Sequence, residues 1–444
     1  MYNVQAMTSI LLKNGRIIDP KTSYDRIGDL LVIDSKIVAI GIVEAVPSDT
    51  TTIDCTNCII APGLIDIHVH FREPSAGKHE ETIATGAVAA AAGGFTTVCT
   101  MPNTTPGIDS PEKIADTIEA AKSVAKCRVL PTGCATLGRH GQQLAPIAEM
   151  TKFGAIAFTD DGDVIEDDAM MSAVLTAANA ANRCVMQHCQ SPEMTVGGVM
   201  HEGEVQKKLG YIGWPRIAEE SIIERDLRLN RTIGCAWHAQ HLSSGGSVAI
   251  IETAQQEGQR ATGEASPHHL LLNDEACETL GTMAKMNPPL RTQVDIDAIK
   301  DGIKRGVITI LATDHAPHPQ ATKDKSFPEA SFGIVGVECA LALYIKALVQ
   351  DGTIDWLHML GMMTCNPASL IGRDDLGSLK VGGKADLTVI DPSLEWTIDA
   401  SLFLSPARNC PFDGWKVQGK AIATIFGGKL TYSCLEKLPE FHLA

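Results

Sequence analysis

Pro62-Gly63-Leu64-Ile65-Asp66-Ile67-His68-Val69-His70 is the stretch that decides the fold, because an apolar strand ends here in two histidines. Side chains alternate between the two faces of a strand, so Asp66, His68 and His70 point the same way. The apolar residues between them would pack outward against helices. Neighbouring imidazoles at the end of a strand are typical of a metal site. The alternative is a pair of hydrogen-bonded core histidines.

This strand begins a repeating pattern in which apolar, strand-like runs alternate with helical stretches. The predicted strands are 64–70, 95–100, 128–134, 153–159, 184–188, 233–241, 260–264 and 307–313. The predicted helices are 82–92, 111–126, 167–181, 216–229, 246–257, 295–304 and 335–350. The alternation predicts an α/β fold built on a parallel (β/α)8, TIM-like barrel.

Shorter strands and turns flank the barrel region on both sides. In residues 8–60, apolar runs are separated by Asn-Gly, Asp-Pro and Asp-Ser turn signals, which predicts an antiparallel β unit. Strand patterns return in residues 384–390 and 421–426. We therefore predict a catalytic barrel over 62–375. Residues 1–61 and 376–444 would form a composite β-sandwich domain.

The composition is that of an ordinary globular protein and excludes several functional classes. Of 444 residues, 44% are hydrophobic and 20% are charged, and the net charge is −16. No run of Lys or Arg suggests a nucleic-acid surface, and no stretch reaches the ~18–20 apolar residues of a membrane span. The thirteen Cys residues, an odd number spread along the chain, fit free thiols in a reducing compartment. With no secretion signal, the expected location is the cytoplasm.

Cys55-Thr56-Asn57-Cys58 is the one Cys-x-x-Cys spacing in the chain. A zinc ribbon needs a second such pair, which the sequence lacks. We interpret the two residues as buried structural thiols rather than as a redox or zinc site.

Histidines and aspartates recur where the predicted strands end, which is where barrel enzymes place functional groups. These residues are His68, His70, Asp160, Asp161, His188, His241 and Asp314. Each one alone fits a simpler interpretation, either a helix N-cap or a satisfied core group. Their shared register at one rim favours a common site. The remaining candidates, His238, His268, His269 and His315, are interpreted as structural or supporting groups.

Four histidines and two aspartates are enough to hold two metal ions. A paired site needs an anionic ligand shared between ions ~3.5–4 Å apart, and the pKa of bound water then falls from ~15.7 toward ~7. Asp314, at the same rim, is placed to take and return a proton. Nitrogen and oxygen ligands without thiolate favour Zn²⁺, with Mn²⁺ or Co²⁺ as substitutes. We expect two zinc ions per subunit.

Five separate motifs point to a known family. They are His68-Val69-His70-Phe71-Arg72-Glu73-Pro74, Met101-Pro102-Asn103-Thr104, Asp160-Asp161-Gly162, Met286-Asn287-Pro288-Pro289-Leu290-Arg291 and Thr313-Asp314-His315-Ala316-Pro317-His318. Through them the chain resembles the amidohydrolase superfamily and, within it, the bacterial type I dihydroorotase family. The resemblance covers nearly the whole chain. It implies conversion between L-dihydroorotate and N-carbamoyl-L-aspartate, a step of pyrimidine synthesis that leads to UMP.

The resemblance also implies roles for the candidate ligands. One zinc would be held by His68, His70 and Asp314, and the other by His188 and His241. Asp161 would bridge them, at the position where many relatives use a carboxylated lysine. The family's spacing to His188 favours Asp161 over Asp160. Asp314 would also be the general acid and base.

Substrate binding is implied for residues around the metals. Arg72 and Asn103 would hold the substrate carboxylate, and a planar guanidinium suits bidentate pairing with it. Arg72 alone also fits a surface loop. The pocket would be completed by Asn287, His318 and the backbone near Phe332 and Gly333. Two residues depart from the family pattern: Ser75 replaces a usual glycine, and His79 lies where a basic residue is expected.

Two other functions stay open at this stage. Allantoinases and dihydropyrimidinases resemble the same barrel but commonly place a lysine on the fourth strand, whereas Lys152 here lies before it. They also lack the arginine found here at position 72. An inactive dihydroorotase-like subunit would only scaffold aspartate transcarbamoylase and would be free to lose ligands that this chain retains.

The resemblance leaves the assembly undecided. A homodimer and a complex of the active enzyme with aspartate transcarbamoylase are both compatible with the sequence. No nucleic-acid or membrane partner is expected. Residues 197–216 are either a mobile cover over the site or a static crossover.

Overall fold

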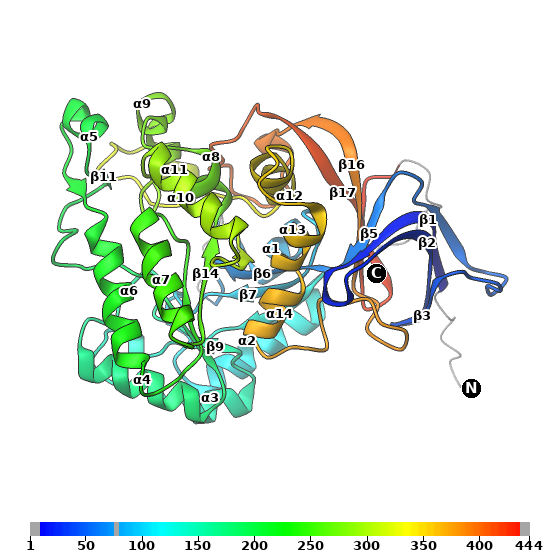
Figure 1. Ribbon diagram of the computed structural model, residues 1–444, viewed down its shortest axis with the longest axis horizontal. Helices are drawn as coiled ribbons and strands as arrows, with labels where there is room; N and C mark the ends of the chain where they lie inside the picture. The colour runs from blue at the N-terminus through cyan, green and yellow to red at the C-terminus, as the bar shows by residue number, and fades with distance from the viewer. Residues whose placement is uncertain (1–8, 75–79, 436–444) are drawn as a thin grey trace.

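The computed structural model describes residues 9–74 and 80–435. Ser75 and His79, the two departures from the family pattern, lie outside the described residues. Figure 1 shows two regions side by side, helices around a central group of strands on the left and a β-sheet on the right. Within the described ranges, no helix is both long and apolar enough to cross a bilayer.

The central strands form two parallel arcs. The first contains β6 (Leu64–Val69), β7 (Phe95–Thr100) and β8 (Arg128–Pro131). The second has the order β15 (Ile310–Leu311), β14 (Ala261–Ala265), β13 (Trp237–Ala239), β10 (Cys184–Gln187) and β9 (Ala157–Phe158). Isolated parallel bridges join the arcs at both seams, between Gly133 and Phe158 and between Val69 and His315. This is the strand order of the predicted α/β barrel.

Several strands are shorter than the sequence predicts. The predicted strand 153–159 is reduced to the two residues of β9. Its first residue, Phe153, belongs to α3 (Ile147–Phe153), and Gly154 ends that helix at φ +116°. The predicted ranges 233–241 and 307–313 likewise exceed β13 and β15. Their last residues leave the strand ladder and turn toward the site.

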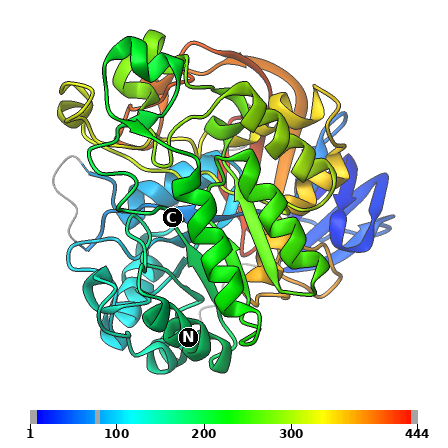
Figure 2. The same ribbon diagram turned by 60° about the vertical axis from the view of Figure 1, so that its left-hand side comes forward.

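Helices cover the outside of the arcs. The long ones are α1 (Ile83–Ala92), α2 (Pro111–Val124), α4 (Asp168–Ala180), α6 (Ile217–Asn230), α7 (Gly245–Gln256) and α10 (Gln293–Lys304), close to the predicted ranges. Side-chain caps explain several starts: Thr82, Ser110, Asp167 and Ser244 each accept a hydrogen bond from the first turn of their helix. In Figure 2 the green helices α6 and α7 run side by side.

The predicted helix over 335–350 is wrong at its start. The helix begins at α12 (Ala340–Tyr344) and continues as a π-helical turn, η4 (Ile345–Val349). Residues before it stay irregular because the Gly336 amide donates to His315 Nδ1, 3.2 Å away. Short helices that the sequence did not reveal are α5 (Glu204–Leu209), α8 (Pro267–Leu271), α9 (Ala276–Leu280), α11 (Gln320–Lys323), α13 (Trp356–Met362) and α14 (Cys365–Leu370). Single 3-10 turns are η1 (Pro20–Thr22), η2 (Leu137–Arg139), η3 (Gly281–Ala284) and η5 (Ala400–Leu402).

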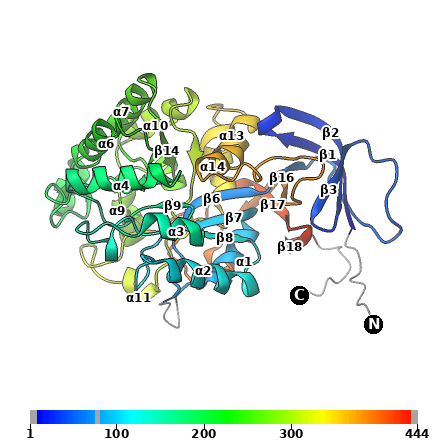
Figure 3. The ribbon, with the colours of Figure 1, turned by 90° about the horizontal axis from the view of Figure 1, so that it is seen from below.

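The two ends of the chain build one sheet, as Figure 3 shows. The early strands are β1 (Ser9–Asp19), β2 (Tyr24–Ile33), β3 (Lys36–Gly41), β4 (Thr51–Asp54) and β5 (Ile59–Pro62). The late strands are β16 (Leu387–Thr397), β17 (Lys416–Phe426) and β18 (Lys429–Ser433). The order is β18-β17-β16-β5-β1-β2-β3, with β4 beside β1. An isolated bridge between Lys36 and Lys384 brings the β3 edge back to the residues before β16. One hydrogen-bonded sheet therefore coils around the core of this region.

The early unit is not wholly antiparallel, as the sequence suggested. Both β4 and β5 pair with β1 in parallel, at Ile10–Lys13 and at Arg16–Ile17. The connection after β3 carries the chain back across the sheet before it runs alongside β1. We propose the division predicted from sequence, 62–375 and the joined segments 1–61 and 376–444, as the two domains.

Residues 197–216 form a small excursion with its own parallel pair, β11 (Met200–His201) and β12 (Gly213–Trp214), around α5. Whether it moves stays an open prediction.

Candidate metal centre

The ends of six central strands converge on one pocket of about 190 Å³. Five of the six proposed ligands line it, and the sixth, His68, is fully buried behind them. The pocket walls also contain every residue that the sequence placed in substrate binding: Arg72, Asn103, Asn287, His318, Phe332 and Gly333. Residues separated by more than two hundred positions in the chain thus meet in one place.

The first group of ligand atoms lies at the seam between β6 and β15. His70 Nε2 is 3.0 Å from Asp314 Oδ1, and His68 Nε2 is 3.6 Å from the same oxygen. The ligand atoms of His68, His70 and Asp314 all lie within 4.8 Å of one another. This is the triad that the sequence assigned to one metal.

Asp161 lies at the centre of the histidines. Its Oδ1 is 3.4 Å from His68 Nε2, 3.7 Å from His188 Nδ1 and 3.8 Å from His241 Nε2. Its Oδ2 is 3.5 Å from His70 Nε2. A carboxylate that faces four imidazoles with both oxygens could be shared between two metal ions.

The second compact group is His68, Asp161 and His241, so His68 belongs to both groups. His188 lies beside this group, with Nδ1 2.8 Å from His241 Nε2. The family resemblance assigns His68 and His70 to one ion and His188 and His241 to the other, so His68 would bind one ion only. The geometry places the His68 ring against both His70 and His241, at centroid distances of 5.2 and 5.1 Å.

The donor set fits metal ions. Among the described residues, His68 Nε2 and Asp161 Oδ1 are buried atoms without a hydrogen-bond partner, and both face the centre. Burial and the neighbouring His241 charge lower the pKa of His188 to about 4, so its imidazole is neutral at pH 7. Neutral imidazole is the form that ligates a metal. Nitrogen and carboxylate donors without thiolate suit Zn²⁺, Mn²⁺ or Co²⁺.

Neighbouring charges shift the pKa values of the proposed ligands His68 and Asp314. Burial alone would lower the pKa of His68, but the carboxylates of Glu264 and Asp161 outweigh it and raise that pKa well above its usual value. Burial alone would raise the pKa of Asp314, but the His68 charge and the His70 hydrogen bond lower it instead. Asp314 is therefore a carboxylate at neutral pH.

Asp160 is turned away from this centre. Its Oδ1 accepts from the amides of Ala135 and Thr136, at 2.9 and 3.0 Å, and its Oδ2 accepts from the Thr136 hydroxyl. With its oxygens engaged in this way, Asp160 holds the loop after β8. Of the two adjacent aspartates, Asp161 is the one that faces the histidines.

Glu264 is the residue that sequence reasoning missed. His68 Nδ1 donates to its Oε1 at 2.5 Å, and His238 Nε2 donates to its Oε2 at 3.0 Å. The His241 amide also donates to Oε1, at 3.0 Å. The sequence offered one signal, which is position. Glu264 is the last residue of the predicted strand 260–264, and the proposed ligands also lie at the ends of their predicted strands. His238 is thereby a supporting group, as predicted.

Removing the Glu264 charge should weaken metal binding. In the Glu264→Gln variant, a neutral amide replaces the charged acceptor shared by His68 Nδ1 and the His241 backbone amide. Changes to such supporting carboxylates typically lower metal affinity about 10- to 100-fold. Competition with a chromophoric chelator measures this. Glu257→Gln, which changes an exposed glutamate paired with Arg231, is the matched control. Equal affinities in the two variants would contradict the role given to Glu264.

Other contacts orient the remaining groups. Asn103 Oδ1 is 3.0 Å from His70 Nδ1, and Gln190 Oε1 is 2.8 Å from His188 Nε2. Arg72 donates from Nε and Nη2 to the Pro317 carbonyl, at 3.2 and 3.1 Å. Asn103 thus supports a ligand as well as lining the pocket. The Asn287 Oδ1 atom is buried without a partner among the described residues.

The other histidines lie outside the ligand groups. His315 Nε2 is 2.5 Å from Glu81 Oε2, and His269 Nε2 is 3.0 Å from the Pro288 carbonyl oxygen. His268 is buried, and neither of its ring nitrogens has a partner within the described part of the chain.

The cysteines take no part in the centre. All thirteen are free thiols. Burial raises the pKa of Cys55 to about 12 and that of Cys58 to about 11. These thiols are therefore protonated and inert, which fits their structural interpretation.

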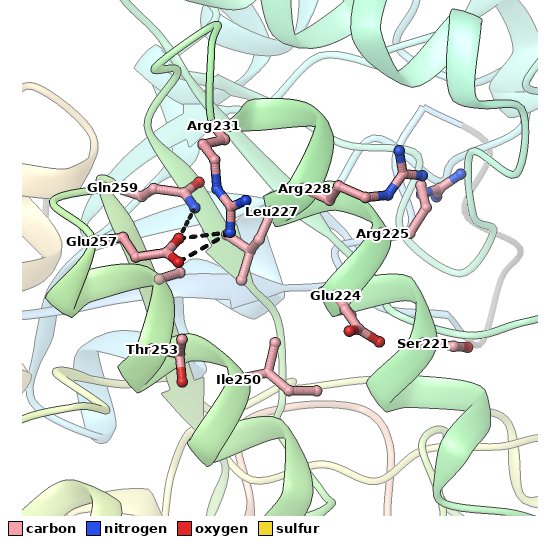
Figure 4. Close-up of a pocket in the computed structure, with 11 residues that line it drawn as sticks. Ser221, Glu224, Arg225, Leu227, Arg228, Arg231, Ile250, Thr253, Glu257 and Gln259 are labelled. Atoms are coloured by element: carbon pink, nitrogen blue, oxygen red, sulfur yellow. Dashed lines mark hydrogen bonds and ion pairs between the residues drawn. The ribbon is translucent and has the colours of Figure 1, made fainter.

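A larger hollow of about 510 Å³ lies between α6 and α7 (Figure 4). Its arginines are already paired: Arg231 with Glu257 at 2.8 Å, and Arg228 with Asp168 at 2.8 Å. Gln259 also contacts Glu257. These paired surface charges lack the convergent, buried donors of the smaller pocket.

Comparison with known proteins agrees with this geometry. Residues 57–247 match a family described as dihydro-orotase-like. The dihydroorotase of Citrifermentans bemidjiense is 41% identical over 96% of this chain and 99% of its own length. That of Bacillus cytotoxicus is 40% identical over 95% of this chain and 98% of its own length.

Solved structures with the same fold include an L-hydantoinase (dihydropyrimidinase) from Arthrobacter aurescens. It is 25% identical, with a TM-score of 0.87 over 97% of each chain. A dihydropyrimidinase from Brevibacillus agri is 22% identical, with a TM-score of 0.83 over 95% of each chain, and shows the fold alone.

Proposed function

Since this chain belongs to the dihydroorotase family, we propose that it interconverts L-dihydroorotate and N-carbamoyl-L-aspartate. The observation that carries the proposal is identity of about 40% to dihydroorotases over nearly the whole length of both chains. The chain is a cyclic amidohydrolase, and its substrate is a small molecule. The reaction opens or closes one ring amide in the pyrimidine pathway.

We propose that two zinc ions occupy the centre. His68, His70 and Asp314 would hold one, His188 and His241 would hold the other, and Asp161 would bridge them. When bound, such ions lower the pKa of water and polarise a carbonyl oxygen. The convergence of four imidazoles and two carboxylates supports this assignment.

We propose Asp314 as the general base and acid. Its Oδ1 lies 3.0 Å from His70 Nε2 and its side chain lines the pocket, whereas Asp161, the other carboxylate there, would be shared between the ions. In ring opening it would take the proton from water and deliver it to the departing ring nitrogen. In ring closure it would run the same two transfers in reverse.

Arg72 would hold the substrate carboxylate. Its side chain lines the pocket and is anchored to the Pro317 carbonyl through Nε and Nη2. This anchor fixes the guanidinium plane, and Nη1, which bonds no described residue, would donate to the carboxylate. Asn103, Asn287 and His318, with the backbone at Phe332 and Gly333, would enclose the ring.

A side-by-side assay tests the substrate assignment. Purified protein is offered L-dihydroorotate, hydantoin and allantoin at equal concentrations, and ring opening of each is followed. We expect kcat/KM to be highest for dihydroorotate. A preference for hydantoin or allantoin would point to the sister enzymes, whose fold this chain shares. No turnover of any of them would favour the inactive scaffold.

Arg72→Ala should weaken use of the carboxylate substrate. Removing one partner of a buried charge pair costs about 2–5 kcal/mol, so kcat/KM for dihydroorotate should fall about 30- to 4,000-fold. Any residual hydrolysis of hydantoin, which has no carboxylate, should change little. Steady-state kinetics on both compounds provides the comparison, and an equal loss on both would argue against a carboxylate contact.

We further propose a cytoplasmic enzyme, consistent with its thirteen free thiols. A homodimer and a complex with aspartate transcarbamoylase remain predictions for sedimentation analysis of the purified protein with and without that partner.

A further inference from the structure

Residues 328–333, called here the 328–333 loop, end at the pocket wall, which Phe332 and Gly333 line. Two buried lysines hold this loop from behind. Lys285 Nζ donates to two of its carbonyl oxygens at 2.9 and 2.7 Å, and Lys323 Nζ donates to two others at 2.9 and 3.1 Å. The four acceptors, in chain order, are Pro328, Ala330, Ser331 and Gly333.

Further contacts fix the end of the loop that faces the pocket. Lys285 Nζ lies 4.2 Å from the centre of the Phe332 ring, which is cation–π distance. The edge of Trp214 packs on the same ring, with centroids 5.9 Å apart. Asn409 Nδ2 donates to the Gly333 carbonyl at 3.1 Å. Phe332 and Gly333 are the two residues of this loop that line the pocket.

These ammonium groups are unusual in lacking a counter-ion. Both lysines are 1% exposed, and no carboxylate of the described chain forms a salt bridge with either. Burial lowers the pKa of Lys285 to about 8, and burial together with the Lys285 charge lowers that of Lys323 to about 7. Burial of a charge without a counter-ion is costly. Stability is therefore a poor reason for two such lysines behind one loop.

We infer that Lys285 and Lys323 are positioning residues, which fix the 328–333 loop so that Phe332 and Gly333 present a preformed wall to the substrate. This inference rests on the proposed function, because the wall matters only if the pocket binds the dihydroorotate ring. A loop that is already ordered in the free protein loses less conformational entropy when the substrate binds. Loss of either lysine should therefore act on substrate binding and leave the metal ligands and Asp314 in place.

The test compares Lys285→Met and Lys323→Met with Lys300→Met as a control. Lys300 is also a paired lysine, but it bonds Asp351 at 2.7 Å on the outer helix α10. In the first two variants we expect KM for L-dihydroorotate to rise about 10- to 100-fold, as expected for loss of charged hydrogen bonds. The kcat should stay within about threefold, since a change in KM alone reports lost uniform binding. The control should match the wild type.

Limited proteolysis gives a second readout that is independent of activity. Lys325 is exposed next to the loop, so trypsin should cleave after it faster once either buried lysine is lost. A purely structural role would lower the melting temperature without a selective rise in KM. Unchanged KM and unchanged cleavage in both variants would overturn the inference, as would a fall in kcat at constant KM.

If neither methionine variant folds, Asn409→Ala tests the same loop through the Gly333 carbonyl. It removes the Asn409 hydrogen bonds to the Gly333 and Ala316 carbonyls and from the His318 amide. KM should rise in the same direction, trypsin should cleave faster after Lys325, and an unaltered KM would overturn the inference. Failure of the proposed function and failure of the lysine inference give different results. Wild-type protein that does not turn over dihydroorotate contradicts the proposed function, whereas active wild type with unaltered variants contradicts the lysine inference alone.

Discussion

Asp314→Asn should reduce kcat for dihydroorotate by about 10²- to 10⁴-fold, the usual contribution of a positioned general base. The amide has the size of the carboxyl group but takes up no proton. Asp314 lies 3.0 Å from His70 and lines the pocket, and the other carboxylate there, Asp161, is the proposed bridging ligand. Stopped-flow or steady-state rates in both reaction directions measure the loss.

The control for this variant is Asp297→Asn, an exposed position on α10 that bonds Gln293 at 2.8 Å. It should retain wild-type rates. Circular dichroism should show that Asp314→Asn keeps its fold. Because Asp314 is also a proposed ligand, bound metal must be counted in the variant. Near-normal turnover by a metal-loaded Asp314→Asn protein would contradict its role in proton transfer.

Removal of metal should abolish activity. Dialysis against a strong chelator is expected to leave less than about 1% of the wild-type rate, because activation of water by metal accounts for a large share of catalysis in such sites. Adding Zn²⁺ should restore the rate, and Mn²⁺ or Co²⁺ should restore part of it. Mg²⁺ is the matched negative control, since it prefers oxygen ligands and water.

The chelated protein should remain folded, because the His68–Glu264 and Thr313–Asp66 hydrogen bonds do not depend on a metal. Its secondary structure is followed in parallel with activity. A protein that stays fully active after verified loss of all metal would contradict the proposed mechanism.

The parts of the fold with strong local signals were predictable from sequence. The strand at 64–70 and the helices over 82–92 and 167–181 match β6, α1 and α4 to within a residue or two. Their apolar spacing and caps are local properties. The predicted helix over 335–350 starts too early because the Gly336 amide bonds His315, a partner 21 positions away in the chain. The predicted strands 153–159, 233–241 and 307–313 are longer than the observed ones.

Much of the candidate site could also be predicted, because the ends of parallel barrel strands lie at one rim. The histidines and Asp161 could be found from their type and register, and the structure brings them together. Glu264 could not be separated from an ordinary strand glutamate, since its contact with His68 spans 196 positions. Lys285 and Lys323 were hidden for the same reason, as their acceptors are backbone carbonyls that carry no sequence signature.

The central claim is that these imidazoles and carboxylates hold a pair of metal ions, and anomalous X-ray scattering at the zinc edge tests it most directly. We expect two peaks about 3.5–4 Å apart. One should lie against His68, His70 and Asp314, the other against His188 and His241, with Asp161 between them. A fully active crystalline enzyme with no peak in this pocket, or with metal bound elsewhere, would contradict the account.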